Sequence, residues 1–161
     1  MATCVLDTSV VVDLHNAQLL ETSQRLSYKL QLPDVIAEEL LEPSAAQLLE
    51  LGFTTISLGS VNAVTTLRAK YPKPSTNDLF AFACAQAEKC ILITGDAELR
   101  KAATAEGIEV HGILWFLDEL VKEKIISRGD AANALERIMS GGSWLPRSEC
   151  AARLKKWRSG G

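Results

Sequence analysis

Short apolar runs alternate with longer amphipathic segments along the chain, and this pattern predicts strands and helices in turn. The runs that predict buried strands are Thr3–Leu6, Phe53–Leu58, Cys90–Thr94 and Glu109–His111, with a weaker one at Leu30–Leu32. The segments that predict helices are Val10–Asn16, Leu19–Tyr28, Val35–Leu41, Ala45–Leu51, Val61–Tyr71, Asp78–Glu88, Ala97–Glu106, Ile113–Lys124 and Asp130–Met139. Strands that alternate with helices favour a parallel sheet covered on both faces. The predicted fold class is therefore α/β, a three-layer α/β/α sandwich around a central, mainly parallel sheet.

Length and composition indicate how this fold is divided. The chain has 161 residues, 47% of them hydrophobic and 23% charged, which is typical of one globular domain with a substantial core. We expect residues 1–140 to form that domain. From Gly141 onward the pattern breaks at Gly141-Gly142 and Pro146, and basic residues crowd the end of the chain: Arg147, Arg153, Lys155, Lys156 and Arg158. Residues 141–161 are therefore expected to be an appendage with a short helix and a basic tail.

The charge distribution limits how the chain can bind a polyanion. With a net charge of −3, the molecule as a whole does not attract nucleic acid, so binding has to come from local basic patches or from a metal ion. One patch is the carboxyl-terminal cluster just described, and the other consists of Arg68, Lys70 and Lys73. A solvated helix end explains this second patch equally well.

The amino-terminal segment and the cysteines predict a cytoplasmic protein. No basic segment precedes the first apolar run, which meets Asp7 at once, and no apolar stretch is long enough to span a bilayer. The four cysteines form no CxxC pair, which is typical of reduced thiols rather than of disulfides or a zinc site. We expect no membrane segment.

Three aspartates fall where predicted strands end or helices begin. Asp7 follows the first strand, Asp96 follows the run that ends at Gly95, and Asp78 opens a helix after Ser75 in a pattern that resembles a capping box. Each aspartate alone is explained as a helix cap. All three, however, are expected at the same edge of the sheet, where ligands bind in open α/β folds. Repulsion between neighbouring carboxylates there is relieved most simply by a divalent cation.

A fourth acid comes from the helix predicted after Pro33. On a helical wheel Glu39 projects near the margin of the apolar face, whereas Glu38 and Glu42 point away from it. A glutamate held toward the core needs a partner. Either a metal ion or a nearby lysine or arginine would satisfy it.

At this point the sequence resembles the PIN-domain family of metal-dependent nucleases, which includes VapC-type toxins. The resemblance runs from Val5 to about Ile126 and is carried by four fragments in order: Leu6-Asp7-Thr8-Ser9-Val10, Val35-Ile36-Ala37-Glu38-Glu39-Leu40, Asn77-Asp78-Leu79-Phe80-Ala81-Phe82-Ala83 and Leu92-Ile93-Thr94-Gly95-Asp96-Ala97-Glu98-Leu99. The family pattern places its glutamate directly before a leucine, which again selects Glu39. His111-Gly112-Ile113-Leu114 and Gly142-Ser143-Trp144-Leu145-Pro146 are also similar to a less studied branch of predicted nucleic-acid-binding PIN proteins.

The resemblance implies a catalytic site of four acids that hold Mg²⁺ or Mn²⁺: Asp7, Glu39, Asp78 and Asp96. It also implies that the hydroxyls of Thr8 or Ser9 and of Thr94 orient these acids. A water made acidic by the metal would attack the phosphorus of RNA, and a second ion, if present, would stabilise the departing oxygen. This describes an endoribonuclease acting on single-stranded or structured RNA, which Arg68, Lys70 and Lys73 would guide. Family behaviour adds a toxin role, a homodimer and a small antitoxin partner.

Rival functions remain open at this point. A haloacid-dehalogenase-type phosphotransferase needs a second acid two residues after the first, where this chain has Ser9. A receiver domain needs a lysine at the end of a late strand, and Glu109-Val110-His111-Gly112 has none. The stronger alternative is a PIN fold that binds RNA or protein without cutting it. His15 and His111 fit no catalytic motif, and Trp115, Phe116 and Leu120 are expected in the core or a dimer interface rather than in a base-stacking platform.

Overall fold

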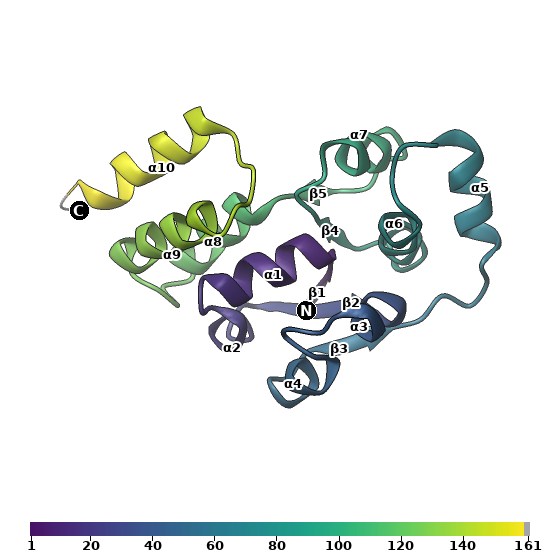
Figure 1. Ribbon diagram of the computed structural model, residues 1–161, viewed down its shortest axis with the longest axis horizontal. Coiled ribbons are helices and arrows are strands. Elements are labelled where there is room, and N and C mark those ends of the chain that lie inside the picture. The colour runs from purple at the N-terminus through teal and green to yellow at the C-terminus, as the bar shows by residue number, and fades with distance from the viewer. Residues whose placement is uncertain (160–161) are drawn as a thin grey trace.

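The computed structural model describes residues 1–159, in which helices and strands alternate as expected (Figure 1). The five strands of this region are β1 (Ala2–Leu6), β2 (Tyr28–Pro33), β3 (Thr54–Ile56), β4 (Ile91–Ile93) and β5 (Val110–His111). Its ten helices are α1 (Thr8–Asn16), α2 (Leu20–Ser23), α3 (Asp34–Glu39), α4 (Ala45–Glu50), α5 (Asn62–Lys70), α6 (Thr76–Glu88), α7 (Ala97–Ala105), α8 (Ile113–Lys122), α9 (Arg128–Ser140) and α10 (Arg147–Arg158). Within these residues no helix combines the length and apolarity needed to cross a membrane.

The sheet is parallel throughout and its strand order is β3-β2-β1-β4-β5. The chain begins at the middle strand, moves outward through β2 and β3, and then crosses to the other side of β1 to form β4 and β5. The winding direction therefore reverses between β1 and β4. In open α/β sheets a ligand crevice lies outside the carboxyl ends of the strands at such a reversal.

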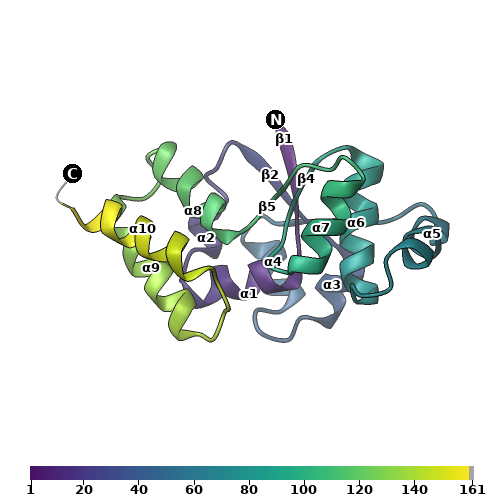
Figure 2. The ribbon, with the colours of Figure 1, turned by 90° about the horizontal axis from the view of Figure 1, so that it is seen from above.

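Helices cover both faces of the sheet, which confirms the predicted three-layer sandwich. Successive side chains of β1 point to opposite faces. Cys4 and Leu6 join a core formed with α1, α8 and α9, and Val5 joins a second core formed with α6 and α7. Figures 1 and 2 show α8, α9 and α10 on one side of the sheet and α5, α6 and α7 on the other.

The helix predicted at Leu19–Tyr28 is wrong, because only Leu20–Ser23 is helical and β2 already begins at Tyr28. The Ser23 hydroxyl donates a 2.6 Å hydrogen bond to the Leu20 carbonyl, and such local bonds compete with helix propagation. From Tyr28 onward polar and apolar side chains alternate, and Leu30 and Leu32 are buried in the α1 face of the sheet. The strand β2 is therefore longer than the predicted one, which covered only Leu30–Leu32.

The helix predicted at Val35–Leu41 ends earlier, at Glu39. Pro43 has no N–H to bond to the Glu39 carbonyl, and its ring would clash with that carbonyl if the helix continued. Leu41 consequently lies 88% exposed instead of on an apolar helix face.

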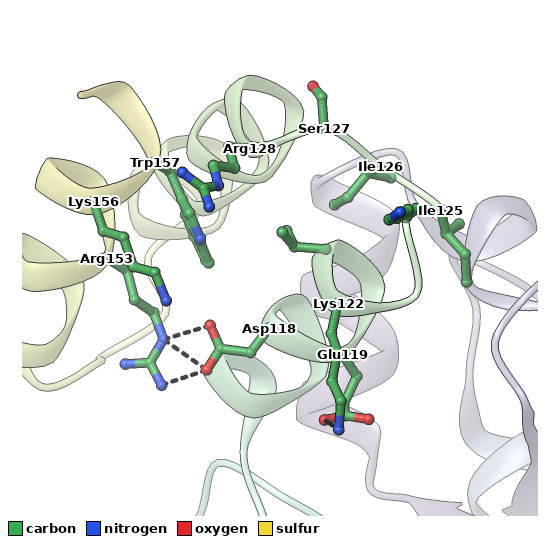
Figure 3. Close-up of a pocket in the computed structure, with 12 residues that line it drawn as sticks. Asp118, Glu119, Lys122, Ile125, Ile126, Ser127, Arg128, Arg153, Lys156 and Trp157 are labelled. Atoms are coloured by element: carbon green, nitrogen blue, oxygen red, sulfur yellow. Dashed lines mark hydrogen bonds and ion pairs between the residues drawn. The ribbon is translucent and has the colours of Figure 1, made fainter. Parts of the chain in front are cut away.

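The carboxyl-terminal segment carries α10, which packs against α9. Cys150 and Trp157 are buried in the core that α1, α8 and α9 share. The Arg153 guanidinium also forms a bidentate pair with Asp118 of α8, with Nη2 2.7 Å from Oδ2 (Figure 3). The division of the chain at residue 140 stays a prediction, and residues 160 and 161 of the expected basic tail lie outside the described residues.

Candidate active site

Asp7 lies at the junction of β1 and α1, on the carboxyl edge of the sheet. Its backbone N–H continues the sheet by donating to the Ile93 carbonyl of β4 at 3.0 Å, so the residue sits between the two strands where the winding reverses. Its side chain is only 4% exposed. One carboxylate oxygen, Oδ1, accepts the Thr8 N–H at 2.7 Å and caps α1.

Thr94 connects Asp7 to Asp96. The fully buried Thr94 hydroxyl donates to Asp7 Oδ2 at 2.7 Å and accepts the backbone N–H of Asp96 at 3.1 Å. Asp96 in turn caps α7, because its Oδ1 accepts the Leu99 N–H at 2.8 Å. Thr94 thus contacts both aspartates, and its orienting role stays a prediction.

Asp78 stands in the first turn of α6 and forms the predicted capping box with Ser75. Asp78 Oδ2 accepts the Ser75 N–H at 2.9 Å, and the Ser75 hydroxyl accepts the Asp78 N–H at 3.1 Å. α6 packs on β1, which brings its amino end to the carboxyl edge where Asp7 lies.

The electrostatics of Asp7 include the charges of the other two aspartates. Burial raises the pKa of the Asp7 carboxyl above its ordinary value, and repulsion from Asp78 and Asp96 raises it further. The hydrogen bonds from Thr94 and Thr8 oppose this rise by favouring the charged form. A buried carboxylate with two acidic neighbours is the arrangement that a cation would relieve.

Glu39 reaches the site through another residue. It is exposed rather than held toward the core, so that part of the prediction is wrong, since α3 ends at Glu39 and leaves it at the helix terminus. Asn77 Nδ2 donates a hydrogen bond to Glu39 Oε2. Because Asn77 precedes Asp78, this contact places Glu39 at the amino end of α6.

The donor chemistry of this edge suits a hard divalent cation, which prefers carboxylate oxygens. Asp78 and Asp96 each use one oxygen as a cap, and within residues 1–159 no protein donor bonds to Asp78 Oδ1 or Asp96 Oδ2. These oxygens are therefore available to a ligand. In the same described region, no three or more His, Cys, Asp or Glu side chains are already arranged as a set of metal ligands.

The other predicted site residues contact the surrounding fold rather than the four acids. The Ser9 hydroxyl accepts the Gly95 N–H at 3.4 Å, which ties α1 to the loop before Asp96. Arg68 holds the segment ahead of α6, because its Nη1 donates to the Pro72 and Pro74 carbonyls at 2.9 and 2.7 Å. Two lysines of the predicted RNA-guiding patch form ion pairs, Lys70 with Glu106 at 3.1 Å and Lys73 with Glu98 at 3.8 Å.

Two features of this region were missed in the sequence. Asn77 was not predicted as a site residue, although its amide can donate a hydrogen bond to a second carboxylate beside Asp78. Asp13 lies in the apolar stretch Val10–Leu14 of α1, which is the signal that could have drawn attention to it. It is buried, and the Ser143 hydroxyl donates a hydrogen bond to its Oδ1. Burial raises the pKa of Asp13, and this hydrogen bond opposes the rise.

Two hollows flank the helices on the α8 side. One has a volume of about 500 Å³, begins beside Asp96 at Gly95 and Ala97, and extends to Trp144. The other, of about 940 Å³, lies between the end of α8 and α10 (Figure 3). Glu123, just after α8, accepts hydrogen bonds from Ser27, which precedes β2, so this larger hollow lies at the amino edge of the sheet, away from the acids.

Thiol chemistry does not take part in this site. All four cysteines are free, and burial raises the pKa of the Cys4 and Cys84 thiols to about 12. Both therefore stay protonated at neutral pH.

The parallel sandwich with acids at its topological switch point defines a class of α/β protein in which function is located at the carboxyl edge. A family model described as a PIN domain matches residues 3–159, and the chain belongs to the PIN-domain family. The match extends beyond Val5–Ile126, the range of the predicted resemblance, and covers α9 and α10. A search of curated proteins gave no match. Membership of the family indicates a nuclease-type or RNA-related function.

Proposed function

We propose that this chain is a Mg²⁺- or Mn²⁺-dependent endoribonuclease that hydrolyses phosphodiester bonds of single-stranded or structured RNA at the carboxyl edge of its sheet. The observation that carries the proposal is Asp7, a buried carboxyl whose pKa is raised by burial and by the nearby charges of Asp78 and Asp96. A group of this kind at a topological switch point is typical of a functional site.

The four acids Asp7, Glu39, Asp78 and Asp96 would hold the cation. When bound, a divalent cation neutralises phosphate charge and lowers the pKa of a water molecule. The chain itself supplies position: the Thr8 N–H and the Thr94 hydroxyl fix the Asp7 carboxylate, and Asn77 holds Glu39. Hydrolysis adds water across a P–O bond of the RNA strand, leaving one end with a phosphate and the other with a hydroxyl.

The same edge favours a phosphate group for a second reason. α1, α6 and α7 all begin here, as the caps at Asp7, Ser75 and Asp96 show. The partial positive charge at each helix amino end attracts anions. These dipoles offset part of the repulsion between the acids and an approaching RNA backbone.

Cleavage of single-stranded RNA by the purified protein in Mn²⁺ tests the proposal, with Asp7→Asn as the inactive variant. Asp130→Asn is the matched control, because it also removes a carboxylate from a helix amino end, but at the amino edge of the sheet. We expect cleavage by the wild type and by Asp130→Asn, and loss of at least about a hundredfold in Asp7→Asn. Equal cleavage by all three would indicate a contaminating nuclease, and binding without cleavage would favour the alternative of a non-cleaving RNA- or protein-binding PIN module.

The family resemblance is the basis of our proposal for the biological setting. We propose a cytoplasmic enzyme, consistent with four free cysteines, that forms a homodimer and is held inactive by a small antitoxin as part of a toxin-antitoxin pair. Light scattering that gives the mass of one chain would contradict the dimer. Copurification with a short protein encoded beside it would support the antitoxin.

A further inference from the structure

We infer that the hollow beside Asp96 is a nucleobase-binding site, in which a base of single-stranded RNA stacks on Trp144 next to the phosphate held at the acids. The inference rests on the proposed function for its choice of RNA as the ligand. The hollow has a volume of about 500 Å³, within the range of small-molecule pockets and large enough for a base with its ribose. Gly95 and Ala97, the neighbours of Asp96, are among the residues that line it.

Three aromatic rings line the hollow, those of Trp144, Trp115 and His111. Trp144 is 82% exposed, an unusual position for so large an apolar ring. The Trp115 ring, which also lines the hollow, stacks on His111 with centroids 4.2 Å apart and ring planes 7° from parallel. Of the predicted core residues on α8, Phe116 is fully buried, whereas Trp115 is half-buried and contributes to this wall. Flat aromatic walls are the surfaces on which single-stranded bases stack.

The charges at the hollow suit a base more than a bare phosphate. Among residues 1–159, Arg100 forms no ion pair or side-chain hydrogen bond, and it lines the hollow together with Glu149 and with Arg153, whose guanidinium is paired with Asp118. The Arg100 guanidinium lies beside Gly112, where a Cβ would be in ordinary contact with Arg100 Nη1 at 3.4 Å. The donors of Arg100 and the acceptor oxygens of Glu149 match the mixed hydrogen-bonding edge of a base. A guanidinium also stacks well on aromatic systems.

The loop that carries Trp144 is anchored to α1 by the residues just before it. Gly141 approaches α1 so closely that a Cβ would meet Asn16 Nδ2 at 2.8 Å, and Gly142 has a φ of +94° that favours glycine. Ser143 donates its hydrogen bond to the buried Asp13 of α1. Both contacts direct the chain toward the hollow before α10 begins.

The larger hollow at the amino edge is a weaker site for RNA. Its rim carries Lys124, Arg128 and Lys156, whereas Arg153, which lines both hollows, is already paired with Asp118. It also lies at the opposite edge of the sheet from the acids. A strand bound there would not reach Asp7.

Binding without cleavage tests the inference, measured by fluorescence anisotropy in a chelator with a short single-stranded RNA. A strand of equal length that lacks bases serves as the second probe. Stacking predicts that Trp144→Ala weakens binding of the base-bearing strand by about 5- to 100-fold and leaves binding of the abasic strand unchanged. Trp144→Phe should recover most of the lost affinity. Leu49→Ala, a change of another exposed apolar residue that lies on α4, is the control and should bind like the wild type.

Tryptophan fluorescence gives an independent readout. We expect RNA to quench the emission of the wild type, and the quenching to fall sharply in Trp144→Phe. Arg100→Gln should weaken binding of the base-bearing strand, whereas Arg25→Gln, at the amino edge, should not. Equal affinity of wild type and Trp144→Ala for the base-bearing strand would overturn the inference even if the enzyme cuts RNA. Trp144-dependent binding without Mn²⁺-dependent cleavage would instead reject the nuclease proposal and keep the base site.

Discussion

The chain contains two capping boxes that are locally almost the same and differ in what surrounds them. At α6, Ser75 and Asp78 exchange hydrogen bonds of 2.9 and 3.1 Å, and at α9, Ser127 and Asp130 exchange bonds of 3.4 and 3.0 Å. Both follow the pattern Ser-x-x-Asp, and each satisfies otherwise unpaired N–H groups at the start of its helix.

Their positions relative to the sheet distinguish them. Asp78 is half-buried at the carboxyl edge and lies close enough to Asp7 to raise the pKa of that carboxyl. Asp130 is exposed at the other edge, beside the end of α8. The local motif therefore determines where the helix begins, and the strand order determines whether its carboxylate meets other acids.

The largest effect that separates the two boxes should be on RNA cleavage. Asp78→Asn is expected to reduce kcat by about a hundredfold or more, because it removes a carboxylate from the proposed metal site. Asp130→Asn is expected to leave kcat within about twofold of the wild type. Asparagine can still accept the hydrogen bond from the serine N–H, so both helices should keep their starts.

Steady-state cleavage assays of the two variants with one RNA substrate measure this difference. Circular dichroism melts of the same samples show whether each variant is folded. If both variants retained wild-type kcat, the two boxes would be equivalent and the acidic edge would not be catalytic.

A smaller loss of activity is expected from Thr94→Val. This change removes the hydroxyl that joins the Asp7 carboxylate to the Asp96 backbone, and loss of a residue that orients a ligand lowers activity by about 10- to 100-fold. Thr94→Ser keeps the hydroxyl and should restore most of the activity. Thr66→Val, which removes an exposed hydroxyl bonded to the Asn62 carbonyl in α5, should have little effect on kcat. Failure of Thr94→Ser to recover activity would assign Thr94 a packing role.

The stability of the metal-free protein should respond to Asp7 in a pH-dependent way. The pKa of Asp7 is raised above 3.8, so the folded state binds this proton more tightly than the unfolded state. The stability that Asp7 contributes is therefore complete below about pH 3.8 and is lost as the pH rises through the folded pKa. Asp7→Asn does not ionise, so its Tm relative to that of the wild type should increase over the same window.

Thermal melts in a chelator from acid to neutral pH measure this relative Tm. Mg²⁺ added at about a hundredfold excess over its Kd should stabilise the wild type by about 2.7 kcal/mol and have a much smaller effect on Asp7→Asn. A relative Tm that does not change with pH would show that Asp7 has the same pKa in the folded and unfolded states. Equal stabilisation of both proteins by Mg²⁺ would place the cation elsewhere.

Most of the fold could be predicted from periodicity, because buried parallel strands and amphipathic helices leave strong signals. The exception, Leu19–Tyr28, combines a helix-like polar stretch with a strand that begins at Tyr28. The pairing of Tyr28 with Ala2 of β1 takes this end of the segment into the sheet. The predicted end of the next helix, at Leu41, was also wrong, because α3 ends at Glu39, ahead of Pro43.

The site was predictable only as a set of positions. Asp7, Asp78 and Asp96 follow from strand ends and helix starts, since parallel topology brings these to one edge. The contacts that orient them depend on side chains distant in sequence, such as Asn77 on Glu39 and Thr94 on Asp7. No local pattern encodes those pairs.

The smallest predicted effect concerns the property that the two capping boxes share, which is their contribution to the stability of the fold. Ser75→Ala and Ser127→Ala each remove one capping hydroxyl, and each should lower the free energy of unfolding by about 1 kcal/mol. For a chain of 161 residues this corresponds to a fall in Tm of about 2–4 °C. Urea or thermal denaturation of the two variants measures both values. Because the lost bonds are alike and both serines are exposed, the two losses should agree to within about 0.5 kcal/mol, the scatter expected between independent sites. A much larger loss of unfolding free energy in Ser75→Ala would mean that the α6 capping box also supports the fold around Asp7. The two boxes would then differ in stability as well as in chemistry.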